Sequence, residues 1–218
     1  MAYRVDNIPF WLKPLFLLYS YSLGFFLYVF FILFFRATLK IEFEGKENLE
    51  KGPFIYCIWH EDLSSFFLVF KKLQSSQIWL NHPLWYMKPV HVLLWFLGIK
   101  RLVLGSTGNQ GKEGAQKLEA LLKDEKVSTT FAVDGPKGPP KIIKKGALYA
   151  SLNTGFPLMP LRFVVGPSFR IKKTWDQKKC ALPFGRIKVL CSKPLYVNKE
   201  NFDEAYDELE NLLNEKEI

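Results

Sequence analysis

A long apolar stretch without a single charge lies close to the N-terminus and limits the folds open to this chain. From Leu15 to Phe35 the sequence reads LFLLYSYSLGFFLYVFFILFF, which is 21 uncharged residues. A helix of that length reaches about 31 Å, enough to cross the hydrocarbon core of a bilayer. The run is too long for a secretory signal, and Arg36 follows it without a small-residue cleavage site. We therefore expect membrane attachment; the alternative is a helix buried in a soluble core.

Residues of the kind that settle at a membrane–water interface flank this stretch. They are Trp11, Lys13 and Tyr19 at its start, and Arg36 and Lys40 after it. Basic residues at both ends leave the orientation open. Gly24, or the serines at 20 and 22, could bend the stretch into a helical hairpin lying in one leaflet. The sequence thus predicts a membrane-anchoring segment over residues 1–38, either as one hydrophobic helix or as a hairpin.

Composition narrows the partners but does not choose among them. The chain has 218 residues, of which 49% are hydrophobic, so it can bury a sizeable core. Its net charge of +9 favours anionic partners such as nucleic acid, an anionic leaflet or a phosphorylated small molecule. Cys57, Cys180 and Cys191 lack the spacing of a disulfide framework or a metal site, so we interpret them as buried, reduced thiols.

Beyond the anchor, strand-like and helix-like segments alternate along the chain. This alternation predicts an α/β fold, an αβ sandwich with a largely parallel central sheet, over residues 39–218. The expected strands cover residues 39–45, 54–59, 76–81, 100–105, 127–133, 157–165 and 185–197, and the expected helices cover 63–73, 88–98, 113–124, 146–155 and 201–215.

Three polar clusters follow expected strands, at the ends where open α/β sheets bind ligands. The first is His60 with Glu61 and Asp62. Histidine is the usual general base near neutral pH, and a carboxylate can fix its tautomer. A structural histidine is the alternative. We interpret His82 and His91, in an aromatic, proline-containing stretch, as packing or interface residues.

The second cluster, GSTGNQG at residues 105–111, precedes an expected helix. It lacks the ending of a nucleotide P-loop and the glycine spacing of a dinucleotide site. Its amides, with the hydroxyls of Ser106 and Thr107, could hold an anion at the helix N-terminus. An ordinary glycine-rich turn explains the same letters.

The third cluster, DGPKGPP at residues 134–140, is a stiff loop of glycines and prolines. Asp134 opens the loop and Lys137 lies at its tip. An acid and a cation held over a strand end suit a phosphorylated ligand. A surface turn with a solvated basic run is the alternative.

The order of these motifs resembles a known family. A strand ending in WH, then LGST, DGPKGP, KKG, NTGFPLMPL and TWD with LPFGRIKV follow one another from about residue 40 to 198. This order is similar to the lysophospholipid acyltransferase superfamily, which contains glycerol-3-phosphate and 1-acylglycerol-3-phosphate acyltransferases. It looks most like a bacterial branch long classified as a domain of unknown function. DGPKGP followed by TGFPLMP is the most specific part.

The resemblance implies an acyltransferase that moves a fatty acyl group from acyl-CoA or acyl-carrier protein to a hydroxyl of a lysophospholipid or glycerol phosphate. His60 would be its general base. The acceptor-binding loop would comprise Asp134, Gly135, Pro136, Lys137 and Gly138, with Ser106 and Thr107 as further substrate contacts. The thioester is a co-substrate; no other cofactor and no metal is implied. The expected partners are the phospholipid bilayer and these substrates, and the expected location is the cytoplasmic face of a bacterial inner membrane.

Two departures from the family pattern stand out. The family places an aspartate five residues after its histidine, where this chain has Ser65, and an arginine near the position of Leu104. Asp62 or Glu61 would have to orient His60 instead. A non-catalytic, lipid-binding module that kept the fold is therefore the alternative function. Nucleic acid is not an expected partner, because only the net charge suggests it and no binding motif accompanies that charge.

Overall fold

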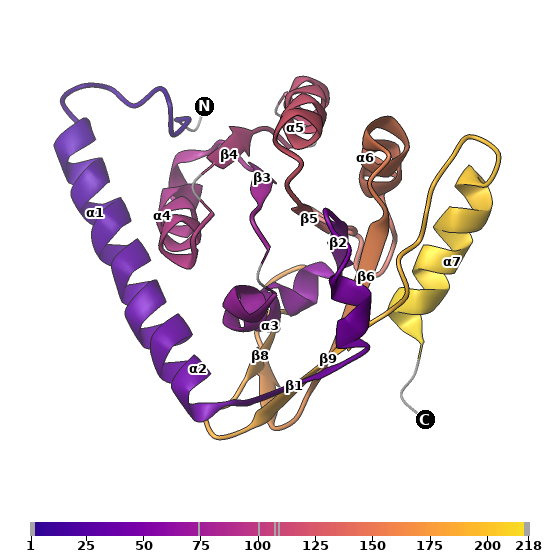
Figure 1. Cartoon of the computed structure of the whole chain (residues 1–218). Helices are drawn as coiled ribbons and strands as arrows, with labels where there is room; N and C mark the ends of the chain where they lie inside the picture. Colours follow the sequence, from indigo (N-terminus) through magenta and orange to yellow (C-terminus); the bar gives the residue numbers. More distant parts are fainter. Residues whose placement is uncertain (1–2, 74, 100, 107, 109, 216–218) are drawn as a thin grey trace.

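The structure is a computed structural model that describes residues 3–73, 75–99, 101–106, 108 and 110–215. Its centre is a five-stranded sheet with the order β1-β9-β6-β2-β5 (Figure 1). Neighbouring strands are parallel except β6 and β9, so the predicted fold class is confirmed. The strands are β1 (Lys40–Glu44), β2 (Ile55–Ile58), β5 (Thr129–Ala132), β6 (Leu158–Val165) and β9 (Arg186–Cys191).

A second, parallel pair of strands extends this sheet. It consists of β3 (Ile78–Asn81) and β4 (Arg101–Leu104). A parallel bridge between Gln77 and Ser128 joins the start of β3 to the start of β5. The N–H of Ile78 donates to the carbonyl of Ser128 at 3.1 Å. The two sheets are thus continuous at the beginnings of these strands.

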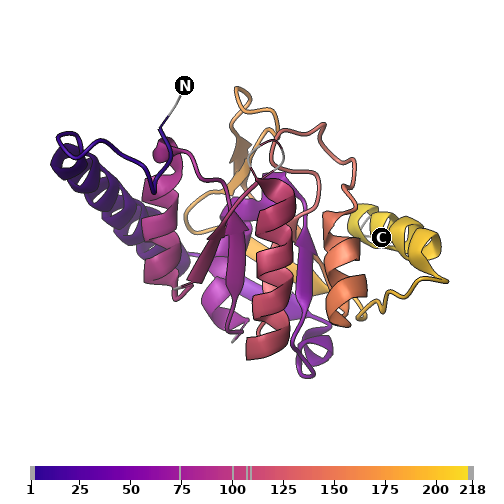
Figure 2. The ribbon, with the colours of Figure 1, turned by 90° about the horizontal axis from the view of Figure 1, so that it is seen from above.

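Helices cover both faces of the sheet, as alternation along the buried strand β2 requires. Phe54, Tyr56 and Ile58 pack with α3 and α4, whereas Ile55 and Cys57 pack with α6 and α7. Seen from above, α1 and α4 run side by side at one end of the molecule and α7 lies at the other (Figure 2). The helices are α3 (Leu63–Val69), α4 (Lys88–Leu97), α5 (Gly111–Glu125), α6 (Gly146–Thr154) and α7 (Phe202–Asn214).

The chain also forms a hairpin that the sequence did not predict. Its antiparallel strands are β7 (Ser168–Arg170) and β8 (Lys179–Ala181), and all three residues of β7 are exposed. β7 is exposed and β8 has only three residues, so neither strand gives an apolar alternation that could be recognised in the sequence. The expected strand over 185–197 is shorter than predicted: β9 ends at Cys191, and Leu195 makes only an isolated bridge to Leu158.

The N-terminal apolar stretch forms one continuous helix from Lys13 to Thr38, rather than a hairpin. It comprises α1 (Lys13–Phe26), a π-helical stretch (Leu27–Phe34) and α2 (Phe35–Thr38). The helix packs closely on α4 at Gly24, where a Cβ atom would lie 2.6 Å from Cβ of Val92. Of the two arrangements left open, the single helix is the one present, and Gly24 allows the close approach of two helices instead of bending the stretch.

Most of this helix faces away from the rest of the protein. It is long and apolar enough to cross a membrane by length and composition, and only a small part of it is buried. The buried residues are Ser20, Gly24 and Ile32, on the side toward α4 and the core. An exposed, uncharged helix surface of this kind suits an apolar environment better than water.

The three cysteines are buried and unpaired, as expected. Cys57 lies in the middle of β2, and Cys191 ends β9. Burial raises the pKa of the Cys191 thiol to about 12, so this group is inert at neutral pH.

Candidate active site

The carboxyl ends of four strands meet around one cleft. His60 follows β2, Gly135 follows β5, Ser106 follows β4 and His82 follows β3. All four residues line a cavity of about 590 Å³. The three polar clusters noted in the sequence therefore come together in space, at the edge of the sheet where the strand ends predict a ligand site.

A split in the sheet opens this cleft. β3 and β5 are hydrogen-bonded where they begin, at Ile78 and Ser128. Farther along, Leu80 of β3 and Phe131 of β5 both line the cavity instead of pairing with each other. Near the start of the split, Gln77 Oε1 accepts hydrogen bonds from Trp79 Nε1 and Thr130 Oγ1, both at 2.7 Å.

The carboxylate that faces His60 comes from a distant part of the chain. Asp176 Oδ2 lies 2.6 Å from His60 Nδ1. The rings of His60 and Trp175 lie next to each other, with centroids 4.8 Å apart. From the sequence, Asp62 or Glu61 is expected in this role; the carboxylate in contact is instead Asp176, because the loop between β7 and β8 brings it to the imidazole.

This contact defines the state of the imidazole. A carboxylate accepts hydrogen bonds, so His60 Nδ1 carries the proton and Nε2 carries the free lone pair. A Cβ atom on Gly135 would lie 2.7 Å from His60 Cδ2 and 3.5 Å from Nε2. The missing side chain of Gly135 therefore leaves space beside the free nitrogen, and His60 lines the cleft.

The surroundings of His60 keep its imidazole neutral. Burial lowers the pKa of His60, and the charge of Lys178 lowers it further. The Lys178 ammonium lies 3.2 Å from His60 Nδ1 and donates to Asp176 Oδ2. Asp176 and Asp134 act in the opposite direction on this pKa, but the net shift is downward. The base form of His60 therefore predominates at neutral pH.

Asp176 stays ionised although its side chain is almost fully buried. Burial alone would raise the pKa of Asp176, but hydrogen bonds, first from Lys178, lower it to about 2. Its second oxygen, Oδ1, is buried without a hydrogen-bond partner among the residues that the structure describes. A negative charge is thus fixed against His60.

Glu61 fastens the hairpin that delivers Asp176. One of its oxygens lies 2.5 Å from Lys141 Nζ, and the other accepts a hydrogen bond from Arg170 on β7. Ser64 Oγ holds the other strand by donating to the carbonyl of Lys179. The acid next to His60 in sequence therefore positions the hairpin, and it does not touch the imidazole through these contacts.

Asp62 has a different environment from the one expected. It is buried at the start of α3, and its burial, with the nearby charge of Glu61, raises its pKa to about 7. The charge of Asp62 is not among the influences that set the pKa of His60. Asp62 is thus a buried acid that holds its proton to a much higher pH than an exposed aspartate does.

The 134–138 loop is held rigidly beside the imidazole. Asp134 accepts hydrogen bonds from the backbone N–H of His60 at 2.8 Å and from that of Lys141 at 3.0 Å. Gly138 packs on Trp175, where a Cβ atom would lie 2.6 Å from the ring. Asp134 is buried, so both of its oxygens serve the backbone and its role here is to join the loop to the histidine turn.

Of the remaining loop residues, Pro136 lines the cleft and Lys137 is exposed. Burial lowers the pKa of His82, and the positive charge of Lys137 lowers it further. Lys137 therefore acts at the same end of the site as His82. The described cations that line the cavity are Lys112 at the start of α5 and Lys144 before α6, which the sequence analysis did not select. In the sequence, the only indication of these two lysines is that each one follows a glycine-rich loop.

The side chain of Ser106 contacts the ring of His82. Its hydroxyl lies 2.5 Å from His82 Nδ1. From the sequence, we interpret His82 as a packing or interface residue; its ring lies beside that of Tyr86, with centroids 5.8 Å apart, and it also lines the cleft. His91 is buried against Asn81, with 3.2 Å between Nε2 and Oδ1, as a packing residue should be. Thr107 lies outside the described residues.

The side of the cleft between α3 and α4 is apolar. It is formed by Leu63, Phe67, Trp79, Met87 and Val90. The lining of the cavity therefore combines a hydrocarbon-like part with polar and charged groups, which include His60, His82, Lys112, Lys144 and Glu119.

A comparison with solved structures supports the fold, whereas the comparisons of sequence name no function. No family model matches this chain. An uncharacterized protein of Rickettsia prowazekii (strain Madrid E) is 24% identical over 167 residues, which is 75% of each chain. The crystal structure of the 1-acyl-sn-glycerophosphate (LPA) acyltransferase PlsC from Thermotoga maritima superposes with a TM-score of 0.52 at 16% identity, covering 94% of this chain and 89% of the other. The chain thus shares the fold of that acyltransferase.

Proposed function

We propose that the protein is a membrane-attached O-acyltransferase. It transfers a fatty acyl group from a thioester, acyl-CoA or acyl-carrier protein, to a hydroxyl of a lysophospholipid or glycerol-phosphate acceptor. The observation that carries this proposal is the 2.6 Å contact between Asp176 and His60, which leaves Nε2 of the imidazole free beside the cleft. The shared fold with an LPA acyltransferase supports the same reaction class.

The reaction balances on the imidazole. His60 Nε2 takes the proton of the acceptor hydroxyl while the hydroxyl oxygen attacks the thioester carbonyl. A C–O bond forms, and the C–S bond breaks when the tetrahedral intermediate collapses. The imidazolium returns its proton to the departing thiolate. Asp176 stabilises the imidazolium between these two steps, and general base catalysis of this kind contributes about 10²–10⁴-fold.

The apolar and the charged residues of the cleft match the acyl chain and the anionic group of such substrates. The apolar wall formed around Phe67 and Met87 takes the acyl chain. Lys112 and Lys144 attract the anionic group of the acceptor, with Ser106 and the 134–138 loop alongside. These two lysines take the role of the arginine that the family pattern leads us to expect near Leu104.

The N-terminal helix keeps this site at a bilayer. We assign residues 1–38 to membrane anchoring and 39–218 to the catalytic domain, on the cytoplasmic face of a bacterial inner membrane. The exposed, apolar helix supports attachment to a bilayer. The net charge of +9 favours an anionic leaflet, because each Lys or Arg near such a surface adds about 1 kcal/mol to the binding free energy.

A transfer assay tests the proposal. The full chain is reconstituted in vesicles and given radiolabelled acyl-CoA or acyl-carrier protein, with lysophosphatidic acid, lysophosphatidylcholine or glycerol 3-phosphate as acceptor. The wild type should form labelled product, and His60→Ala should lose about 10²–10⁴-fold in rate while it still binds the vesicles. Transfer at equal rates by both proteins contradicts the role of His60. No transfer with any donor and acceptor favours the alternative, a non-catalytic lipid-binding module.

A further inference from the structure

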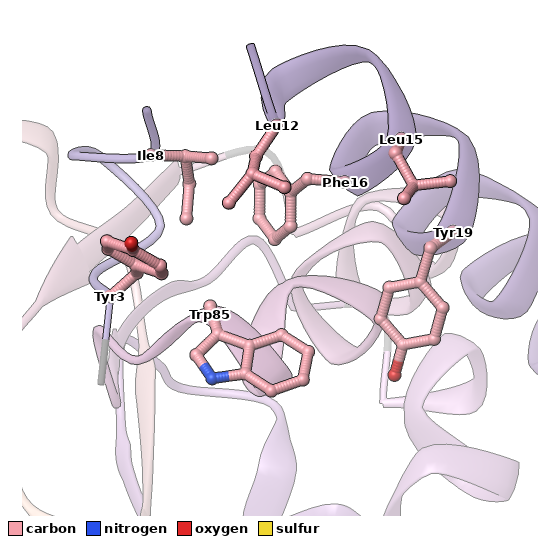
Figure 3. Close-up of a pocket in the computed structure, with 7 residues that line it drawn as sticks. All are labelled: Tyr3, Ile8, Leu12, Leu15, Phe16, Tyr19 and Trp85. Atoms are coloured by element: carbon pink, nitrogen blue, oxygen red, sulfur yellow. The ribbon is translucent and has the colours of Figure 1, made fainter. Parts of the chain in front are cut away.

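We propose that a groove at the start of α1 binds a single hydrocarbon chain of a bilayer lipid. The groove, shown in Figure 3, has a volume of about 580 Å³. It shares no lining residue with the catalytic cleft. This inference rests on the membrane attachment proposed above, but it does not depend on acyl transfer. Seven side chains form its walls: Tyr3, Ile8, Leu12, Leu15, Phe16, Tyr19 and Trp85.

Three segments build the groove and hold its shape. The N-terminal residues 3–12 form one wall, the first turns of α1 a second, and Trp85 the floor (Figure 3). Backbone hydrogen bonds fix the N-terminal wall to the segment that carries Trp85. Val5 N–H donates to the carbonyl of Pro83 at 2.8 Å, and Trp85 N–H donates to that of Tyr3 at 3.0 Å. The groove is therefore a fixed feature of the fold.

The chemistry of the walls selects a hydrocarbon. None of the seven lining side chains carries a charge. Ile8, Leu12, Leu15 and Phe16 have no polar group, so a headgroup placed among them would lose its hydration without gaining a partner. An alkyl chain has no such cost and gains by leaving water. The occupant is thus a lipid tail and not a headgroup.

The aromatic residues place the groove at the level of the membrane–water interface. Tyr3, Tyr19 and Trp85 each combine an apolar ring with a polar tip, and each is partly exposed. Such residues gather where a bilayer meets water. The neighbouring Phe10 and Trp11 are 85% and 65% exposed, which water alone does not favour.

The groove is also continuous with the surface that would lie in the lipid. Leu15, Phe16 and Tyr19 belong to the first turns of the uncharged helix. A tail that leaves the bilayer along this helix meets the apolar side chains of Leu15 and Phe16 at the groove. Trp85 lies three residues after His82 of the catalytic cleft, so the docked lipid sits beside the loop that leads to the active site.

Photolabelling of the full chain tests this directly. The protein is reconstituted in vesicles of phosphatidylcholine that carries a diazirine in one acyl chain, irradiated, and mapped by mass spectrometry. Label should concentrate on the groove residues around Leu12 and Phe16, relative to the outward-facing Phe25 and Phe30. Leu12→Trp fills the groove and should reduce that label by about ten-fold, the effect of displacing one or two buried methylene groups.

A matched pair of variants separates the groove from the helix surface. Leu15 and Leu18 are 66% and 67% exposed on the same helix, but only Leu15 lines the groove. Leu15→Trp should reduce the groove label, whereas Leu18→Trp should leave the labelling pattern unchanged. If Leu12→Trp does not fold, Ile8→Trp fills the groove from the same N-terminal wall and should give the same reduction.

Three results would overturn the inference. Label spread evenly along the outward face of the helix, and unchanged in Leu12→Trp and Ile8→Trp, means that the groove holds no chain. A dimer of the full chain in detergent that Leu12→Trp and Ile8→Trp both dissociate means that a second copy occupies the groove. Retention of the groove label in His60→Ala is expected, and a loss of this label would show that the lipid binds at the catalytic cleft instead.

Discussion

The charge of Lys178 is the main adjustable influence on His60. The imidazole must be neutral to accept a proton, so transfer should fall as the pH drops through the pKa of His60. Burial and the Lys178 charge lower that pKa below its ordinary value of 6.5, so the wild type should keep its rate until the pH is below 6.5. Lys178→Met removes one of these influences and should move the acid limb of kcat/KM to higher pH. Lys178→Arg keeps the charge and is the control; identical limbs in all three proteins would contradict this role.

Asp62 makes the stability of the protein depend on pH. Burial raises its pKa from 3.8 to about 7, so the folded state binds this proton more tightly than the unfolded state. Stability that is present below about pH 4 is therefore lost as the pH rises to about 7. Asp62→Asn removes the ionisable group, and its melting temperature should exceed that of the wild type by about 2–8 °C at pH 8, with a smaller difference at pH 5. Thermal unfolding in one detergent at both pH values measures this, and an equal difference at both would contradict the assignment.

At the level of elements, the contact between α1 and α4 depends on Gly24. A side chain there would meet Val92 and the carbonyl of Pro89, which lies 2.8 Å from the position of a Cβ atom. Gly24→Val should push the helices apart and destabilise the fold by about 1–3 kcal/mol. Ser22→Val, on the exposed side of the same helix, is the control. Thermal unfolding of the two variants in the same detergent compares them, and equal melting temperatures would show that the two helices do not pack in this way.

The elements that could be predicted from the sequence are those whose burial leaves a pattern. The strand at 55–58 is apolar throughout, and Gly98 and Gly155 end their helices in the left-handed conformation, with φ of 106° and 76°. The β7–β8 hairpin leaves no such pattern, since β7 is exposed and is held by Glu61 through Arg170. Contacts of this kind join residues 109 positions apart and cannot be read locally.

The site shows the same division. His60 and the 134–138 loop could be found because they follow buried strands, and a strand end is a position that sequence alone can locate. Asp176 could not be assigned to His60, because 116 residues separate them and the connecting hairpin was not predicted. The letters TWD drew attention as part of a resemblance, without any physical indication of what the aspartate contacts.

For the whole molecule, the arrangement of helix and cleft predicts how the protein associates with membranes. A helix of 26 residues that includes an uncharged run from Leu15 to Phe35 holds by apolar burial, which salt does not screen, whereas the basic surface holds by charge, which salt does screen. The full chain should therefore stay with vesicles through a wash in about 1 M salt and through alkaline carbonate. Flotation of the vesicles before and after each wash measures this. Release by salt alone would mean that charge, and not the helix, attaches the protein.

The central claim is that Asp176, from a distant hairpin, orients the base at His60. Two buried carboxyl groups near this histidine offer a direct comparison: Asp176 touches the imidazole, and Asp62 follows it in sequence. The decisive measurement is kcat/KM for acyl transfer by Asp176→Asn and Asp62→Asn in the same vesicles near pH 7.5. We expect a loss of about 10²–10⁴-fold for Asp176→Asn and a rate close to wild type for Asp62→Asn. The reverse result, a loss in Asp62→Asn with full activity in Asp176→Asn, would contradict the account.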